Sequence, residues 1–179
     1  KATGIVRRID DLGRIVIPKE IRRTLRIREG DPLEIFTDRE GKVILKKYSP
    51  IGELGTLAGI YADSLSKTLD CTVCITDTDQ VIAAAGNGKK ELQEMLLSAE
   101  LAEVFQERKT VLKKSSDAEF VAITKDRREY SEEIISVILS EGDIAGGVIF
   151  LQKNEKKHFG EMEKKFAAGA ADLLGRQLS

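Results

Sequence analysis

Residues 4–25 read GIVRRIDDLGRIVIPKEIRRTL, a segment in which arginines alternate with short apolar runs. The apolar runs predict two strands, over 3–10 and 14–17. Between them, Gly13 can adopt the positive φ that a tight turn needs. The second strand is apolar on both of its faces, so we expect it to be buried.

The residues that follow predict one short helix and a hairpin. Pro18 ends the second strand and presets φ for a first helical turn, so we expect a helix over 19–25. Strands are then predicted over 33–38 and 43–47, joined by a turn at 39–42. A segment of under about 50 residues is marginal as a single chain, because it buries little apolar surface. We therefore expect two copies to form a β-rich dimer.

The first 47 residues are basic, whereas the rest of the chain is acidic. They contain 13 lysines and arginines against 8 aspartates and glutamates, which gives +5. The remaining residues contain 16 against 22, which gives −6. This asymmetry indicates a polyanionic partner, and a merely solvated charged surface is the alternative. The segment has no Cys or His, which excludes a zinc finger, and only one short helix, which excludes a helix-turn-helix.

The same residues resemble the AbrB family of bacterial transition-state regulators. The resemblance covers residues 3–48 and rests on the segment quoted above, on DPLEI at 31–35 and on ILKKY at 44–48. It implies a swapped-hairpin β-barrel, an intertwined dimer in which two chains interleave to bind double-stranded DNA. The resemblance places the DNA contacts on Arg7, Arg14, Arg22 and Arg23, with Arg8, Lys46 and Lys47 as further candidates for phosphate contacts.

Arginine suits this role, because its guanidinium group binds phosphate in a bidentate way and reads guanine edges. The same fold also occurs in antitoxins, which bind DNA with this domain and a toxin with a disordered acidic tail. An antitoxin-type module for DNA binding and protein interaction is therefore the alternative function.

Residues 53–179 predict a second domain of the α+β class, joined to the first domain at 1–48 by a linker at 49–52. Apolar stripes at helical spacing indicate amphipathic helices at both of its ends. Alternating and continuous apolar runs between them predict an antiparallel sheet. The expected helices cover 53–69, 89–109 and 157–178, and the expected strands cover 71–76, 81–85, 120–124, 133–140 and 144–152.

This second domain resembles GAF sensor domains. SVILSEGDIAGGVIFL at 136–151 resembles the GAF core hairpin, and Phe159, Glu163, Phe166 and Ala170 resemble the start of its C-terminal helix. The resemblance implies a regulatory domain that could hold an unidentified small-molecule ligand, and no cofactor is identified.

The combination of an AbrB-type and a GAF-type domain resembles sporulation regulators of endospore-forming bacteria, which activate and repress genes in the forespore. The helices 53–69 and 157–178 are amphipathic, and we expect them to join copies of the chain. Two dimerisation surfaces, one in each domain, would give a homotetramer with closed symmetry.

Residues that suggest catalysis or metal binding have simpler explanations. Cys71 and Cys74 lie three apart on a predicted strand, so they point to opposite faces and cannot share a metal or a disulfide. A GAF-type thiol reductase is a remote alternative. No nucleophile motif accompanies His158, the single histidine, which we expect to be solvated. GNGKK at 86–90 lacks the phosphate-loop pattern and predicts a turn. The sequence therefore predicts neither an enzyme nor a metal site.

The composition predicts a cytoplasmic protein, and the resemblance to DNA-binding regulators implies association with the nucleoid. No apolar run approaches the roughly 20 residues that a membrane-spanning helix needs. The first residues are charged where a signal peptide would be apolar. Two cysteines provide no disulfide framework, which is typical of a reducing compartment.

Overall fold

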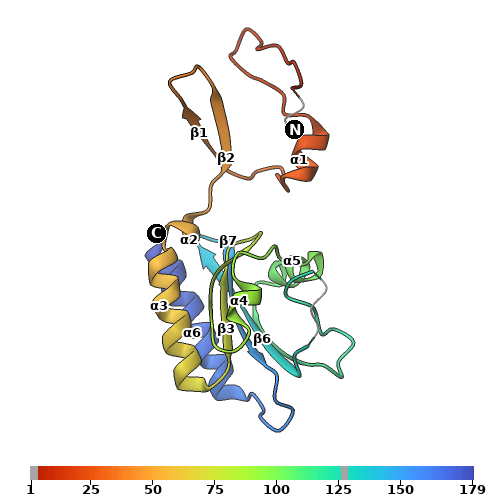
Figure 1. Ribbon diagram of the computed structural model, residues 1–179, viewed down its shortest axis with the longest axis vertical. Coiled ribbons are helices and arrows are strands. Elements are labelled where there is room, and N and C mark those ends of the chain that lie inside the picture. The colour runs from red at the N-terminus through yellow and green to blue at the C-terminus, as the bar shows by residue number, and fades with distance from the viewer. Residues whose placement is uncertain (1–3, 126–128) are drawn as a thin grey trace. The chain divides into compact units, whose positions relative to one another are not determined.

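The computed structural model describes residues 4–125 and 129–179, and the chain divides into two compact units (Figure 1). The first unit, Lys1–Tyr48, is called the head, and the second, Ser49–Ser179, is called the body. In the described part of the chain, no helix is long and apolar enough to cross a membrane.

The head contains the predicted short helix and the predicted hairpin. The helix α1 covers Lys19–Thr24, and the strands β1 and β2 cover Leu33–Thr37 and Val43–Lys47. The strands pair antiparallel. Asp38 closes the hairpin, because its Oδ1 accepts hydrogen bonds from the backbone N–H groups two and four residues later. These elements confirm the prediction for this half of the head.

The two strands predicted at 3–10 and 14–17 are not formed in the single chain, and residue 3 lies outside the described residues. A turn does form between them, with Gly13 at φ 75°. A strand needs a hydrogen-bonded neighbour along its length, and β1 and β2 already pair with each other. Residues 4–10 and 14–17 are called the arms of the head. Most of their apolar side chains therefore lie in solvent, and Val6 is 91% exposed.

The body is a five-stranded antiparallel sheet covered by helices on both faces. The strand order is β4-β3-β7-β6-β5. Helices α3 and α6 lie side by side on one face, and the shorter α4 and α5 cover the other (Figure 1). The helices are α2 Pro50–Glu53, α3 Gly55–Leu69, α4 Lys89–Leu92, α5 Ala99–Gln106 and α6 Glu161–Gln177; the strands are β3 Thr72–Thr76, β4 Val81–Ala85, β5 Thr110–Lys114, β6 Glu132–Ser140 and β7 Asp143–Gln152.

Each face of the sheet has its own apolar core. Small residues bring the long helices close to the first face: Ala62 of α3 and Ala167 of α6 are fully buried there. A Cβ added to Gly175 of α6 would lie 2.1 Å from the backbone oxygen of Leu139, so the helix backbone rests on β6 at this point. The second core is built from larger side chains, among them Phe105 of α5. The α+β class with an antiparallel sheet, predicted from the sequence, is confirmed.

Residues 49–52, predicted to be a linker, are instead part of the body. The side chain of Ser49 caps α2 by accepting a hydrogen bond from Gly52 N at 3.2 Å. Its hydroxyl also lies 2.9 Å from a carboxylate oxygen of Asp77, to which it donates. Ile51 is fully buried in the first core. The linker prediction failed because a single apolar residue after a proline shows no periodicity, although it packs in the core.

The long helix predicted over 89–109 is broken into α4 and α5. Glu94 adopts φ 61°, and Ser98 starts α5 by accepting a hydrogen bond from Leu101 N at 3.1 Å. The predicted strand over 120–124 is reduced to an isolated bridge at Thr124. The sheet edge is formed instead by β5. The prediction missed this strand because two of its five residues are lysines, which interrupt the apolar pattern. The cap at Ser98 was the one local signal of the break.

Candidate nucleic-acid interface

Helix α1 presents the arginine pair of the head. Arg22 and Arg23 lie in its last turn, and both are exposed. Pro18 precedes the helix, and its carbonyl oxygen accepts the first hydrogen bond, from Arg22 N at 3.0 Å. Basic side chains at the C-terminal end of a helix are stabilised by its dipole, so the same charges favour the helix. The pair is therefore available to a polyanion.

The turn before α1 holds a third arginine in place. The carboxylate of Asp10 accepts hydrogen bonds from the backbone N–H of Leu12 at 3.0 Å and of Arg14 at 2.8 Å. Its second oxygen lies 2.8 Å from Nε of Arg14, and the arginine side chain is still 71% exposed. These backbone and side-chain bonds with Arg14 hold the pKa of Asp10 below its usual value. The sequence did not reveal this interaction.

Arg7 and Arg8 lie in the arm before that turn, and both are exposed. Neither forms an ion pair with a residue in the described part of the chain. With α1 and the turn, they complete a set of five exposed arginines in the first half of the head.

The two lysines predicted as phosphate contacts differ in their surroundings. Lys46 is exposed. The side chain of Lys47 is only 22% exposed, because its ammonium donates to the backbone oxygen of Arg26 at 2.9 Å and pairs with Asp31 at 3.3 Å. Lys47 therefore connects β2 to the segment after α1. Adjacent residues of a strand point to opposite faces, which explains the difference between the two lysines.

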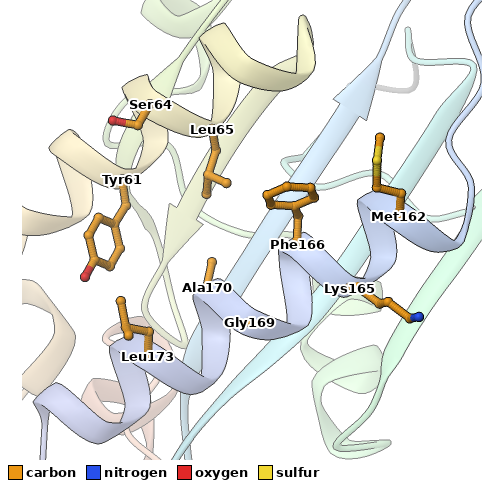
Figure 2. A pocket seen from close by; sticks show the side chains of 9 residues that line it. All are labelled: Tyr61, Ser64, Leu65, Met162, Lys165, Phe166, Gly169, Ala170 and Leu173. Carbon is orange, nitrogen blue, oxygen red and sulfur yellow. The ribbon is translucent and has the colours of Figure 1, made fainter.

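The body has a groove between α3 and α6 with a volume of about 580 Å³. Figure 2 shows side chains from both helices converging on it. Phe166 and Leu173 of α6 are 42% and 45% exposed, although both are large and apolar. Part of each amphipathic helix's apolar stripe thus lies in the groove, whereas Phe159 and Leu174 are buried in the first core. The groove is lined by Tyr61, Ser64, Leu65, Met162, Lys165, Phe166, Gly169, Ala170 and Leu173.

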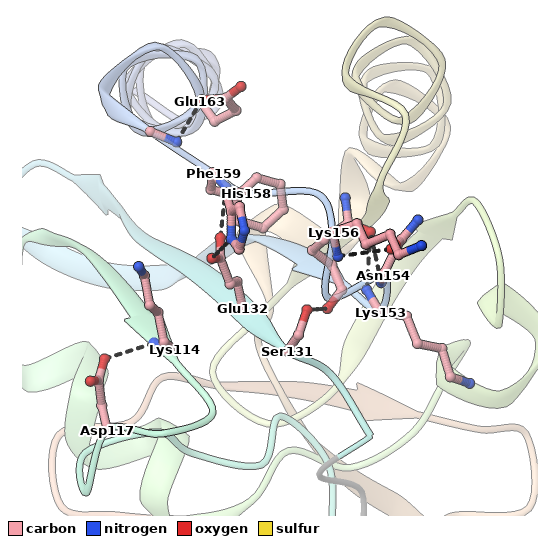
Figure 3. Close-up of polar contacts among 12 residues, drawn as sticks. Lys114, Asp117, Ser131, Glu132, Lys153, Asn154, Lys156, His158, Phe159 and Glu163 are labelled. Carbon is pink, nitrogen blue, oxygen red and sulfur yellow. Dashed lines mark hydrogen bonds and ion pairs between the residues drawn. The ribbon is translucent and has the colours of Figure 1, made fainter.

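The side chains of Glu132 and His158 meet just before the start of α6, as Figure 3 shows. Glu132 of β6 is almost fully buried, and its two oxygens accept hydrogen bonds from the backbone N–H of Phe159 at 2.6 Å and from the ring of His158 at 2.7 Å. The His158 ring remains largely exposed, as expected, but it is paired rather than merely solvated. Sequence reasoning missed Glu132.

The next residue of β6, Glu133, is buried on the opposite face. Its Oε1 accepts a hydrogen bond from Val121 N at 2.9 Å, whereas its Oε2 has no hydrogen-bond partner among the described residues. Burial raises the pKa of this carboxyl to about 7, and the nearby Lys113 offsets part of that effect. Buried polar atoms without a hydrogen-bond partner are rare in a core, and a charged residue within an apolar run was the one indication of Glu133 in the sequence.

The two cysteines lie on opposite faces of the sheet, as predicted. Cys71 belongs to the first core and Cys74 to the second, and both are free thiols. Burial raises the pKa of each thiol to about 12. Among residues 4–125 and 129–179, no cluster of His, Cys, Asp or Glu could hold a metal ion.

Both units of the chain are similar to known proteins. The family described as stage V sporulation protein T C-terminal, transcription factor, matches residues 53–179. Stage V sporulation protein T of Bacillus subtilis (strain 168) is 50% identical over 182 residues, which cover 99% of this chain and 98% of that protein. The chain belongs to the stage V sporulation protein T family. The sporulation regulator indicated by the sequence is thereby confirmed.

The head of this stage V sporulation protein T family member is also similar to shorter proteins. The transition state regulatory protein AbrB of B. subtilis (strain 168) is 66% identical over 50 residues, which cover 28% of this chain and 51% of that protein. The family described as antidote-toxin recognition MazE, bacterial antitoxin, matches residues 6–53. The resemblance to AbrB is confirmed over the arginine-rich segment.

The body has the fold of GAF domains. The GAF domain of an Acinetobacter phosphoenolpyruvate-protein phosphotransferase superposes with a TM-score of 0.59 at 15% identity, covering 70% of this chain and 81% of that one. A type II free methionine-R-sulfoxide reductase from Thermoplasma acidophilum superposes with a TM-score of 0.56 at 12% identity, covering 72% and 94%. At these identities the likeness concerns the fold alone.

Proposed function

We propose that this protein binds DNA sequence-selectively through its head and both activates and represses sporulation genes. The observation that carries the proposal is the set of exposed arginines on α1, the turn and the preceding arm. Guanidinium groups on phosphates give affinity, and those on guanine edges give sequence preference. Arg22 and Arg23 contact the backbone or the groove wall, and Arg7 and Arg14 reach the bases.

The DNA-binding unit is an intertwined dimer of two heads. The apolar side chains that the single head leaves in solvent support this proposal, because a monomer rarely exposes so many together. They include Val6, Ile9, Leu12, Val16, Ile35 and Val43. The dimer doubles each arginine and gives the two-fold symmetry that suits a palindromic site.

The bodies join through the groove between α3 and α6, which makes the assembly a homotetramer. The groove is lined almost entirely by apolar side chains, and helix packing of this kind fits a second copy of the same pair. The head and the body each form one isologous interface. A tetramer with closed symmetry uses both, so that no head surface and no groove is left unpaired.

The body also provides a place for a small-molecule signal. Support comes from the GAF fold and from the buried Oε2 of Glu133, which finds no hydrogen-bond partner in the part of the chain that the structure describes. The burial of both cysteines argues against thiol catalysis. A thiol with a pKa of about 12 holds almost no thiolate at neutral pH, and the thiolate is the reactive form. The protein acts as a regulator, and not as an enzyme.

The antitoxin alternative is weaker because of the body. That function requires a tail that folds on a toxin, whereas residues 49–179 form a compact unit with two cores. The match of the head to MazE reflects the DNA-binding segment and the first residues of the body.

Replacing Arg22 and Arg23 together by alanine tests the proposal. DNA selected from a random pool by the full-length protein serves as the operator. We expect the double variant to lose specific binding in fluorescence anisotropy while sedimentation shows an unchanged oligomer. The slope of log K against log salt is negative, and each lost phosphate contact should make it shallower by about 1.

Arg39→Ala is the matched control, because Arg39 is an exposed arginine in the hairpin turn and is not among the proposed contacts. It should retain operator binding. If the Arg22/Arg23 double variant binds the operator with wild-type affinity and salt slope, the proposed function is wrong.

A further inference from the structure

The turn of the head contains two adjacent aspartates beside arginines that are proposed to contact DNA. Asp10 and Asp11 carry negative charge where a polyanion would approach, and both are exposed. Simple electrostatics makes such charges unfavourable for DNA binding, because phosphates repel carboxylates. Their environments differ, since only Asp10 forms hydrogen bonds within the described residues.

The two oxygens of Asp10 act on different parts of the turn. Oδ1 accepts the backbone N–H groups of Leu12 and Arg14 and so fixes the path of the chain. Oδ2 accepts from Nε of Arg14 at 2.8 Å and so fixes the side chain. The backbone adds two more bonds across the turn, from Asp10 N to Arg14 O at 3.0 Å and from Gly13 N to Asp10 O at 3.1 Å.

This arrangement leaves one end of the guanidinium free. Nε is occupied by Asp10, whereas the two terminal nitrogens of Arg14 have no partner among the described residues. A pair of terminal nitrogens can still form the bidentate contact with a guanine or a phosphate. A side chain that is already ordered loses less conformational freedom on binding.

We propose that Asp10 is a positioning residue for sequence-specific DNA recognition, which holds the Arg14 guanidinium with its terminal nitrogens toward DNA. Its favourable effect on specific binding exceeds the repulsion between its charge and the phosphates. Asp11 has only the repulsion. The inference rests on the proposed function, because it requires Arg14 to contact DNA.

The test compares substitutions at these two aspartates in the full-length protein. Asp10→Asn keeps an oxygen for the two backbone N–H groups but places an amide nitrogen opposite Nε of Arg14. Asp10→Glu keeps the charge and loses the geometry. We expect both variants to bind the selected operator roughly 2–10-fold more weakly, the range for one side chain that must be ordered on binding. Asp11→Asn should bind as tightly as wild type or more tightly.

Non-specific DNA provides a readout that a general structural defect would not give. Asp10→Asn removes a negative charge, so its affinity for scrambled DNA should stay equal or rise while operator affinity falls. In the Arg14→Ala background, Asp10→Asn should cause no further loss, because the side chain that it positions is gone. Sedimentation and circular dichroism should match wild type.

The outcomes separate this inference from the proposed function. If Arg14→Ala weakens operator binding but Asp10→Asn binds at least as tightly as wild type, Asp10 is not a positioning residue. If Asp10→Asn lowers operator affinity equally with and without Arg14, the inference is also wrong. If Arg14→Ala itself binds like wild type, the assignment of Arg14 to the DNA contact fails, and this inference fails with it.

Discussion

Glu133 should make the body less stable as the pH rises, which is the opposite of the effect of a carboxyl whose pKa is lowered on folding. Its pKa of about 7 in the folded protein exceeds the ordinary value of 4.5, so the folded state binds this proton more tightly than the unfolded state. The stabilisation is complete below the unfolded value and is lost as the pH rises through about 7. We expect wild type to lose roughly 2–3 kcal/mol between pH 5 and 8 relative to Glu133→Gln.

Urea unfolding followed by circular dichroism at both pH values measures that difference. Glu119→Gln is the control, because Glu119 is an exposed carboxylate on the nearby loop. It should show no such change with pH relative to wild type. Parallel curves for wild type and Glu133→Gln would contradict the raised pKa.

At the residue scale, the spacing of Cys71 and Cys74 correctly predicted that they lie on opposite faces of the sheet. The DNA contacts assigned to the arginines stay a prediction. The role of Lys47 could not be predicted, because its bonds to Arg26 and Asp31 join residues that lie far apart in the sequence. Nor could the roles of Glu132 and Glu133, which depend on how deeply β6 is buried. Local sequence specifies which groups are available, and tertiary contacts specify their partners.

At the scale of elements, α6 begins where Glu132 fixes the chain. Glu132→Ala removes the acceptor for the buried N–H of Phe159, and an unsatisfied buried donor costs about 1–3 kcal/mol. We expect the body to be less stable by about that amount in urea unfolding. Glu132→Gln is the matched control, because its amide oxygen can still accept the hydrogen bond from Phe159 N. Equal stability of Glu132→Ala and wild type would exclude this role.

Elements with a simple period were predicted well, and those that depend on their neighbours were not. The hairpin of β3 and β4 and the pair β6 and β7 follow from apolar runs and turn residues. The helix predicted over 89–109 is interrupted at Glu94, whose φ is 61°, and Leu96 and Leu97 form isolated bridges to Gln80 and Thr124. The start of α6 shifted to Glu161 because the residues before it are fixed by Glu132.

At the scale of the whole molecule, substitutions in the groove between α3 and α6 can test the proposed tetramer without disturbing the core. Leu173 lines the groove and is exposed, whereas the next residue, Leu174, is fully buried in the core. Leu173→Asp or Phe166→Asp should therefore leave a folded body and convert the proposed tetramer to dimers joined by their heads. Leu174→Asp should unfold the body, because it buries an unpaired charge.

Sedimentation and circular dichroism distinguish these results. Ile60→Asp is the control, because Ile60 is an exposed apolar residue of α3 that does not line the groove. It should remain a tetramer. A tetramer that persists in the Phe166/Leu173 double variant would place the interface elsewhere.

The head should not fold as a monomer, because its arms have no strand partner in the single chain. No residue of α1 is buried, and Val6 and Val16 are 91% and 73% exposed. Pairing of two heads would bury these side chains and supply the missing ladder, so folding and association become one step. For a fragment of residues 1–48, the midpoint of thermal unfolding should therefore fall on a roughly hundredfold dilution. A unimolecular fold would keep the same midpoint, and sedimentation of a folded monomer would contradict the intertwined dimer.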